Sequence, residues 1–150
     1  MSLEQEIMTR LKEAMKSKDE DALRSLRAIK AEIIKAKTEA GAGGVINEDG
    51  ELKLLQRMAK QRKDSLEIFE NQGRADLAAK EKAELAVIEQ FLPEQLSEEK
   101  LKEILSEIIK QTGAAGPQDM GKVMGVATKQ LAGKADGKAI SSQVKALLNP

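Results

Sequence analysis

The segment Phe91-Leu92-Pro93-Glu94-Gln95 decides how this chain is divided. Proline has no backbone N–H to donate inside a helix and disfavours helical geometry at the residue before it, so a helix arriving from the N-terminal side ends here. Ser97 comes two residues later and is a good helix N-cap, followed by two glutamates that suit the positive end of a helix dipole. We therefore predict two modules, residues 1–93 and 94–150.

The first module begins with apolar residues at intervals of three and four, a spacing that places them on one face of a helix. Ser17 and Glu20 then have the spacing of a capping box, in which the hydroxyl and the carboxylate each accept a hydrogen bond from a free backbone N–H. We expect a second helix to start there. The expected inward residues are Leu3, Ile7, Leu11 and Ala14 or Met15 in the first helix, and Ala22, Leu26, Ile29, Ile33 and Ala36 in the second.

The stretch Gly41-Ala42-Gly43-Gly44 interrupts the helical pattern. Because glycine loses the most conformational entropy on entering a helix, we predict a flexible loop that runs to Gly50. A third helix is expected from Glu51 to Gly73, where glycine can take the left-handed conformation that ends a helix. A fourth follows. The expected inward residues are Leu52, Leu55, Met58, Leu66 and Phe69, and then Leu77, Leu85, Ile88 and Leu92.

The second module shows three further helical patterns. The first starts after Ser97 and ends by Gly113, the second ends at Gly133, and the third is capped by Asp136. The expected inward residues are Leu101, Ile104, Leu105 and Ile108, then Met120, Met124, Ala127 and Leu131, and then Ile140, Val144 and Leu147. The predicted fold class is therefore all-α, with an N-terminal bundle of about four helices followed by a C-terminal three-helix module.

Composition excludes several kinds of function. The chain of 150 residues has no Cys and no His, which rules out disulfides, Cys/His zinc sites and every catalytic triad that needs an imidazole. No run approaches the roughly 20 apolar residues of a membrane span, and the first residues are acidic where a secretory signal is basic. We expect a cytoplasmic protein with no membrane partner. Only two phenylalanines are aromatic, too few for a base-stacking platform.

Positive charge gathers toward the C-terminal end. Residues 114–150 hold five lysines against two aspartates, a net charge of +3 in a chain whose formal net charge is zero. Lys122 and Lys129 are seven residues apart, as are Lys138 and Lys145, so each pair shares a helix face. Together with Lys134 they are the candidates for neutralising phosphates. Charge alone favours the alternative that these lysines simply cover solvated helix faces.

Gly121 and Gly125 form a GxxxG pair in the sixth expected helix. Small residues at this spacing let two helices approach closely, which we expect here in preference to a ligand role, although Gly121 can also open a helix N-terminus to an anion. The sequence from Gly116 is close to that of a phosphate-binding P-loop, but Val123 stands where that loop needs Ser or Thr to hold Mg²⁺. We therefore predict no nucleotide site, no metal and no other cofactor.

The remaining charged groups favour no catalytic residue. The basic residues Arg57, Lys60, Arg62 and Lys63 are followed closely by carboxylates, so ion pairs one helical turn apart, such as Lys63 with Glu67, explain much of the cluster. The carboxylates of Asp64, Glu84 and Glu89 lack the apolar sequence setting expected of a general acid or base, and we interpret them as surface groups.

Five motifs follow one another through the whole chain. They are Gln61-Arg62-Lys63-Asp64-Ser65 with Phe69 and Gly73-Arg74, then Ala83-Glu84-Leu85, then Phe91-Leu92-Pro93-Glu94-Gln95-Leu96-Ser97, then Asp119-Met120-Gly121-Lys122-Val123-Met124-Gly125, and then Gly133-Lys134-Ala135-Asp136-Gly137. In this order they resemble the GatB/YqeY family of small bacterial proteins, which is related to the tail domain of the B subunit of glutamyl/aspartyl-tRNA amidotransferase.

The resemblance implies an all-helical N-terminal part and a C-terminal part similar to the amidotransferase tail that contacts the elbow of tRNA. On this basis the tRNA-binding residues would be Lys122, Lys129, Lys134, Lys138 and Lys145 with Gly121 and Gly125. The implied partners are tRNA and an amidotransferase or aminoacyl-tRNA synthetase complex, with the chain as an adaptor.

The resemblance implies no catalysis by the chain alone, because the catalytic domains of the amidotransferase have no counterpart here. Any carbon–nitrogen ligase activity with glutamine as amide donor would be inherited from that enzyme. The alternative is a helical protein–protein interaction module that binds no RNA.

Overall fold

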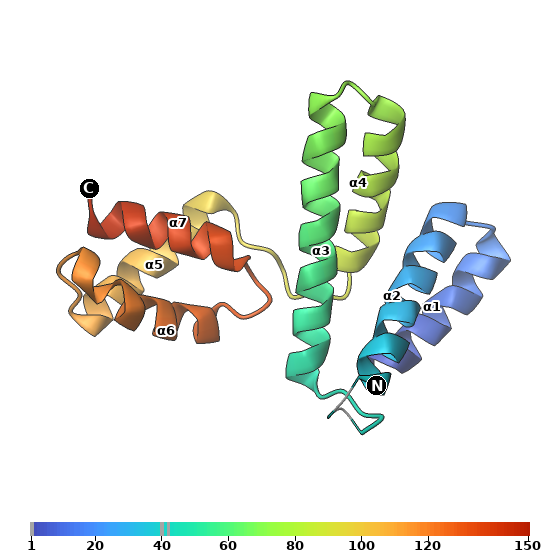
Figure 1. Cartoon of the computed structure of the whole chain (residues 1–150), viewed down its shortest axis with the longest axis horizontal. Helices are drawn as coiled ribbons and strands as arrows, with labels where there is room; N and C mark the ends of the chain where they lie inside the picture. The colour runs from blue at the N-terminus through green and yellow to red at the C-terminus, as the bar shows by residue number, and fades with distance from the viewer. Residues whose placement is uncertain (1, 40, 42) are drawn as a thin grey trace. The chain divides into compact units, whose positions relative to one another are not determined.

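The computed structural model describes residues 2–39, 41 and 43–150. Over this part of the chain it shows seven α-helices, one 3-10 helix and no strand. The α-helices are α1 (Leu3–Ser17), α2 (Glu20–Thr38), α3 (Glu48–Asn71), α4 (Ala75–Glu89), α5 (Glu98–Thr112), α6 (Met120–Gln130) and α7 (Gly137–Leu148), and the 3-10 helix η1 (Pro117–Asp119) leads into α6 (Figure 1). The predicted all-helical fold class is confirmed.

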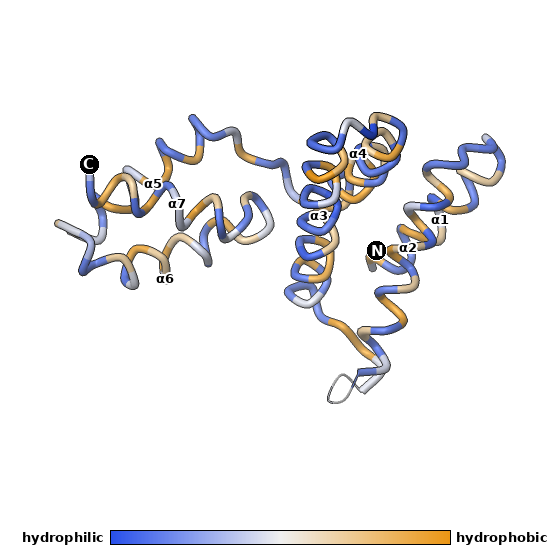
Figure 2. The backbone as a smooth tube through the Cα atoms, turned by 45° about the horizontal axis from the view of Figure 1, so that its top comes forward, coloured by the Kyte–Doolittle hydropathy of each residue, from blue (hydrophilic) through white to orange (hydrophobic). Residues whose placement is uncertain are grey.

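The chain divides into two compact units, Met1–Pro93 and Glu94–Pro150. Each unit buries its own apolar core, and apolar and polar segments alternate along the helices in Figure 2, as expected where each helix has one apolar face. The first core contains Leu3, Ile7, Ala14, Leu23, Leu26, Ile29, Ile33, Leu54, Leu55, Met58, Ala59 and Ile88. The second contains Leu101, Leu105, Ile108, Val123, Ala127, Leu131, Ile140, Val144 and Leu148.

The N-terminal unit consists of two antiparallel helical hairpins, α1–α2 and α3–α4 (Figure 1). The α3–α4 pair makes the most extensive helix contact in the chain, and α2 joins the hairpins by packing on α4. Ser2 caps α1 in a capping box with Gln5. The α3–α4 turn passes through Gly73, whose φ of +70° is the left-handed value expected of a glycine that ends a helix.

The C-terminal unit is a group of three helices in which each helix contacts the other two. Ser97 caps α5 by accepting a hydrogen bond from the Lys100 N–H at 3.2 Å, and Gly113 ends that helix in the left-handed conformation. The segment before α5 is tied to the turn before α7, because the Leu96 N–H donates to the Lys134 carbonyl at 3.0 Å. These contacts fix the start of α5 beside the start of α7.

The predicted start of the second helix was wrong. Ser17 is the last residue of α1, and its hydroxyl donates to the Ala14 carbonyl at 3.3 Å. Lys18 then takes a left-handed conformation, and Asp19 caps α2 by accepting from the Ala22 N–H at 3.1 Å. The carboxylate therefore performs the capping role that the sequence pattern assigned to the hydroxyl.

Two further expectations differ from the structure, and a third falls partly on residues that the structure does not describe. The third helix begins at Glu48 after the N-cap Asn47, one turn earlier than expected. Leu148 is buried in the second core, whereas Leu147 is only partly buried beside it. The predicted flexible loop at 41–44 includes residue 42, and residue 40 precedes it; both lie outside the described residues.

Candidate functional site

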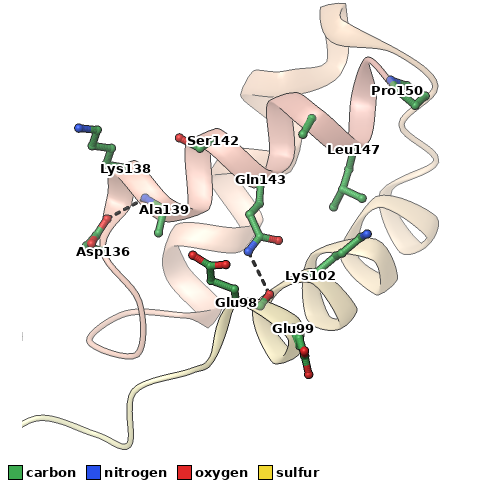
Figure 3. Close-up of a pocket in the computed structure, with 11 residues that line it drawn as sticks. Glu98, Glu99, Lys102, Asp136, Lys138, Ala139, Ser142, Gln143, Leu147 and Pro150 are labelled. Atoms are coloured by element: carbon green, nitrogen blue, oxygen red, sulfur yellow. Dashed lines mark hydrogen bonds between the residues drawn. The ribbon is translucent and has the colours of Figure 1, made fainter.

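The C-terminal unit has an open groove of about 860 Å³ between α5 and α7. One wall is the first two turns of α5, with Glu98, Glu99 and Lys102. The other wall is α7, from which Gln143 and Leu147 extend toward α5 (Figure 3). We call this hollow the α5–α7 groove.

Small side chains on α7 leave room for the α5–α7 groove. Ala139, Ser142 and Ala146 follow one another at intervals of three and four, so they lie on one side of α7. The opposite side of the helix carries Ile140 and Val144, which are buried in the core. The small residues are therefore exposed or half-buried, and Leu147 adds apolar surface to the groove.

Polar contacts fix the two walls relative to each other. Gln143 Nε2 donates to the Glu98 carbonyl oxygen at 3.0 Å, which joins α7 to the first turn of α5 (Figure 3). Asp136 Oδ1 accepts from the Ala139 N–H at 2.7 Å and so caps α7 at one end of the groove. Because both helix starts are held, the groove is largely preformed.

The charges around the α5–α7 groove are unevenly placed. The carboxylates of Glu98 and Glu99 stand at the start of α5, and neither forms an ion pair in the described part of the chain. Lys102 lies one turn further along α5, toward the Leu147 end, and Lys138 stands at the rim, pointing away from α5 (Figure 3). The groove thus has an acidic end and an apolar middle.

All five predicted lysines are exposed. Lys122 and Lys129 lie on the side of α6 opposite the buried Val123 and Ala127, while Lys138 and Lys145 share one flank of α7. Lys134 lies in the turn between these helices. Only Lys138 borders the α5–α7 groove, so the structure does not gather the five lysines at this hollow.

The expected packing role of Gly121 and Gly125 was wrong. Both residues are exposed on α6, and a Cβ atom added to either would meet no atom within 4 Å. No neighbouring helix approaches them, because the helix period turns this side of α6 away from the core that α6 shares with α5 and α7. A GxxxG spacing alone therefore does not mark a helix contact here.

A cluster of ion pairs in the N-terminal unit corrects the interpretation of Glu84 as a surface group. Its side chain is 14% exposed, and its two oxygens lie 3.0 Å from Arg24 Nε and 2.9 Å from Arg62 Nη1. Arg62 Nη1 also lies 3.1 Å from Glu81 Oε2. The cluster joins α2, α3 and α4, and the bonds to Asp21 and Glu84 raise the pKa of Arg24.

This cluster supports a structural role better than a catalytic one. The two oxygens of Glu84 each face a guanidinium, so neither is presented to a substrate. The predicted pair of Lys63 with Glu67 is absent among the described residues, where Arg62 pairs across the helix interface instead. The described residues include no group of three or more carboxylates placed to hold a metal ion, and none of their helices is both long and apolar enough to cross a membrane.

Sequence reasoning named Asp136 as a cap, Lys138 as a candidate cation, Leu147 as an inward residue, and Glu98 and Glu99 at a helix start, but it assigned none of them to a groove. The available signal was the row of small residues Ala139, Ser142 and Ala146 on one side of α7. Such a row indicates where the side chains of a helix are small, but only the packed structure shows that α5 does not cover this side. The acidic wall at Glu98 and Glu99 could be interpreted from sequence only as favourable charge at a helix start.

Comparison with known proteins gives one family and several relatives. The family described as YqeY-like protein matches residues 4–148. A protein of Pyrenophora tritici-repentis named "Altered inheritance of mitochondria protein 41, mitochondrial" is 32% identical over 138 residues, which cover 90% of this chain and 75% of that protein. A protein of the same name from Candida glabrata is 33% identical over 138 residues, covering 91% of this chain and 72% of that protein. An uncharacterized protein of Schizosaccharomyces pombe is 32% identical over 96 residues, covering 64% of this chain and 76% of that protein.

These findings correct the functional expectation. The named relatives are called after mitochondrial inheritance, and their names mention neither tRNA nor an amidotransferase, so the assignment as a tRNA-binding amidotransferase adaptor was wrong. The expectation of a bacterial protein is also corrected, since these relatives are fungal and two are named mitochondrial. The resemblance to YqeY proteins is confirmed.

Proposed function

The chain belongs to the YqeY-like protein family, and we propose that it is a non-catalytic docking protein that holds an amphipathic helix of a partner protein in the α5–α7 groove. The observation that carries this proposal is the groove itself, an open hollow of about 860 Å³ with small and apolar residues in the middle and unpaired carboxylates at one end. Grooves of this kind between packed helices accept the apolar face of a further helix.

The shape of the groove favours a helix as the occupant. Ala139 and Ala146 are seven residues apart on α7, a separation of roughly 10 Å at the rise of an α-helix. Two turns of a bound helix would therefore lie along them, with its side chains at positions i, i+3 or i+4, and i+7 entering the space that the alanines leave. Leu147 supplies apolar contact at one end.

Charge favours a particular orientation of that helix. A basic residue at one end of the bound helix would meet Glu98 and Glu99, which have no ion-pair partner among the described residues. An acidic residue toward the other end would meet Lys102. Pairs at the rim of an interface set orientation and partner choice more than affinity, so the apolar contacts provide most of the binding energy.

Selection from a displayed library of amphipathic helical peptides tests the proposal. We expect the selected peptides to share a basic end and an apolar face, and to bind at least about tenfold more weakly to Ala146→Phe, whose ring fills the middle of the groove. Ala146 is exposed, so the variant should fold. Ala132→Phe is the matched control, because Ala132 is exposed but does not line the groove.

Reversing the acidic end provides a second readout. Glu98→Lys combined with Glu99→Lys should change the selected peptides from basic to acidic at that end. Selected peptides that bind Ala146→Phe as well as the unmodified chain would contradict the proposal, as would a charge preference that the double reversal leaves unchanged.

We also propose that the two units fold independently, as a four-helix bundle over residues 1–93 and a three-helix module over 94–150. The separate cores support this division. A cavity made in one core should then unfold that unit and leave the other folded. We also propose a cytoplasmic location for this chain. Two relatives differ in this respect, because their names contain the word "mitochondrial".

A further inference from the structure

One face of the α1–α2 hairpin combines exposed apolar side chains with cations. Met8, Met15 and Ile34 are 41%, 60% and 48% exposed, and they lie together on this face. We call this surface the methionine face. Its members are Met8, Lys12 and Met15 of α1, and Arg27, Lys30 and Ile34 of α2.

Helical geometry places the α1 members together. Leu3, Ile7 and Ala14 mark the side of α1 that is buried. Met8 and Met15 each follow a buried residue directly, so they lie about 100° around the helix from it, with Lys12 between them on the same side. The acidic residues Glu6 and Glu13 fall on the opposite flank. The carboxylate of Glu4 also falls on the methionine side, where it is paired with Lys37 of α2.

An ion pair across the hairpin shows that this side of α1 adjoins the matching side of α2. Lys37 Nζ lies 2.8 Å from Glu4 Oε2. Because the helices run antiparallel, the residues that precede Lys37 at helical intervals lie beside those that follow Glu4. The side of α1 that carries Met8 and Met15 and the side of α2 that carries Arg27 and Ile34 therefore form one continuous surface.

The methionine face is the side of the hairpin that the rest of its unit leaves free. The other flank of α2 is engaged, since Arg24 Nε lies 3.0 Å from Glu84 of α4 and Glu32 lies 3.6 Å from Arg57 of α3. On α1, Arg10 bonds Gln90 beyond the end of α4 and lies over the ring of Phe91. Both helices thus turn their opposite flank toward α3 and α4.

The cations of this face differ from the other cations of the hairpin in their ion pairing. Lys12, Arg27 and Lys30 form no ion pair among the described residues, in contrast to Arg10, Arg24 and Lys37 of the same hairpin. Unpaired cations between exposed apolar side chains suit a surface that offers both negative charge and hydrocarbon. A bilayer with anionic headgroups is such a surface.

We propose that the methionine face docks reversibly on the surface of an anionic membrane. The two hollows described in this unit lie elsewhere, at the start of α1 and between α3 and α4. Flexible methionine and lysine side chains can reach the headgroup boundary, with methyl groups inward and ammonium groups at the phosphates. This docking needs no membrane-spanning helix, and it is independent of the α5–α7 groove.

Sedimentation with lipid vesicles tests the proposal. The full chain should bind vesicles of equal parts phosphatidylglycerol and phosphatidylcholine at low salt, and should bind phosphatidylcholine alone much more weakly. A lysine near an anionic surface strengthens binding by roughly fivefold, so Lys12→Glu with Lys30→Glu should weaken binding by at least about thirtyfold. Met8→Gln with Met15→Gln should weaken it several-fold at unchanged net charge.

A control of equal charge change separates this face from general attraction. Lys60→Glu with Lys63→Glu alters two exposed, unpaired lysines of α3 and should retain most of the vesicle binding. Circular dichroism confirms that each variant is folded before it is compared. Failure of the unmodified chain to bind anionic vesicles would overturn the proposal. Equal losses in the α3 control, an unaffected methionine variant, or binding to soluble polyglutamate in place of vesicles would overturn it too.

Discussion

In the N-terminal unit, charged side chains bridge helices at several points, whereas residues 94–150, all of which the structure describes, contain no ion pair. Arg24, Arg62, Glu81 and Glu84 join three helices of the first unit, and Lys37 joins α2 to α1. The second unit relies on a core of nine buried apolar residues, two side-chain caps and a few hydrogen bonds to backbone carbonyls.

This difference indicates which surface of each unit is available for binding. Where ion pairs hold helices together, the cations are already bound to carboxylates. The cations of the methionine face differ because they form no ion pair among the described residues. Where no ion pairs form, all charges stay at the surface, including the carboxylates of Glu98 and Glu99 beside the α5–α7 groove. Salt should therefore affect the stability of the first unit more than that of the second.

The largest expected effect is a cavity in the second core. Leu105 is fully buried, so Leu105→Ala should reduce the free energy of unfolding of residues 94–150 by about 2–5 kcal/mol, enough to unfold a unit with so small a core. Hydrogen exchange should show loss of protection in α5, α6 and α7 and unchanged protection in α1 to α4. Loss of protection in both units would contradict their independence. Leu147→Ala, at a partly buried position, is the milder control.

A smaller effect is expected from breaking the ion-pair cluster of the first unit. Glu84→Ala leaves Arg24 and Arg62 without their shared partner and should cost roughly 1–3 kcal/mol of unfolding free energy, the partial exposure of both arginines limiting the loss. Urea unfolding at low and high salt measures it, and the difference from the unmodified chain should shrink with salt. Glu67→Ala removes an exposed carboxylate outside the cluster and should change little.

The smallest expected effect concerns Glu51 at the start of α3. Partial burial, with the nearby carboxylates of Glu48 and Glu6, raises its pKa above the ordinary value of 4.5, although a Leu3 backbone hydrogen bond opposes the shift. The folded protein then holds a proton that the unfolded chain has released, so stability falls as the pH rises through 4.5 and stays reduced above the folded pKa.

Glu51→Gln removes this penalty. The variant should melt slightly higher than the unmodified chain at neutral pH, and the difference should vanish well below pH 4.5. Thermal melts across a pH series measure it. A variant that is less stable at neutral pH would show that the ionised carboxylate contributes more through the α3 dipole than it costs.

The helices themselves could be predicted from sequence, because apolar spacing and end signals are local. Gly113 and Gly133 take positive φ values near the ends of α5 and α6 as expected, and Ser97 and Asp136 act as caps. The errors arose where two residues compete for the same capping role. At the start of α2 the Ser17 hydroxyl donates to the Ala14 carbonyl within α1, and Asp19 is the cap instead.

The surfaces could not be predicted in the same way, because they depend on which side of each helix its neighbours leave open. The row Ala139, Ser142 and Ala146 is visible in the sequence, yet only the position of α5 makes it the wall of a groove. The sequence-based expectation of no membrane partner considered only spanning helices, whereas docking by a helix face depends on tertiary structure.

The most direct test of the docking function is an amide chemical-shift map of the full chain titrated with a selected amphipathic peptide. We expect amide shift changes to be concentrated at Glu98, Ala139, Ser142 and Ala146, with little change on α6 or in the N-terminal unit. The same changes should disappear in Ala146→Phe. Shifts centred on the outer side of α6, around Lys122 and Lys129, or shifts unaffected by filling the groove, would contradict the docking function.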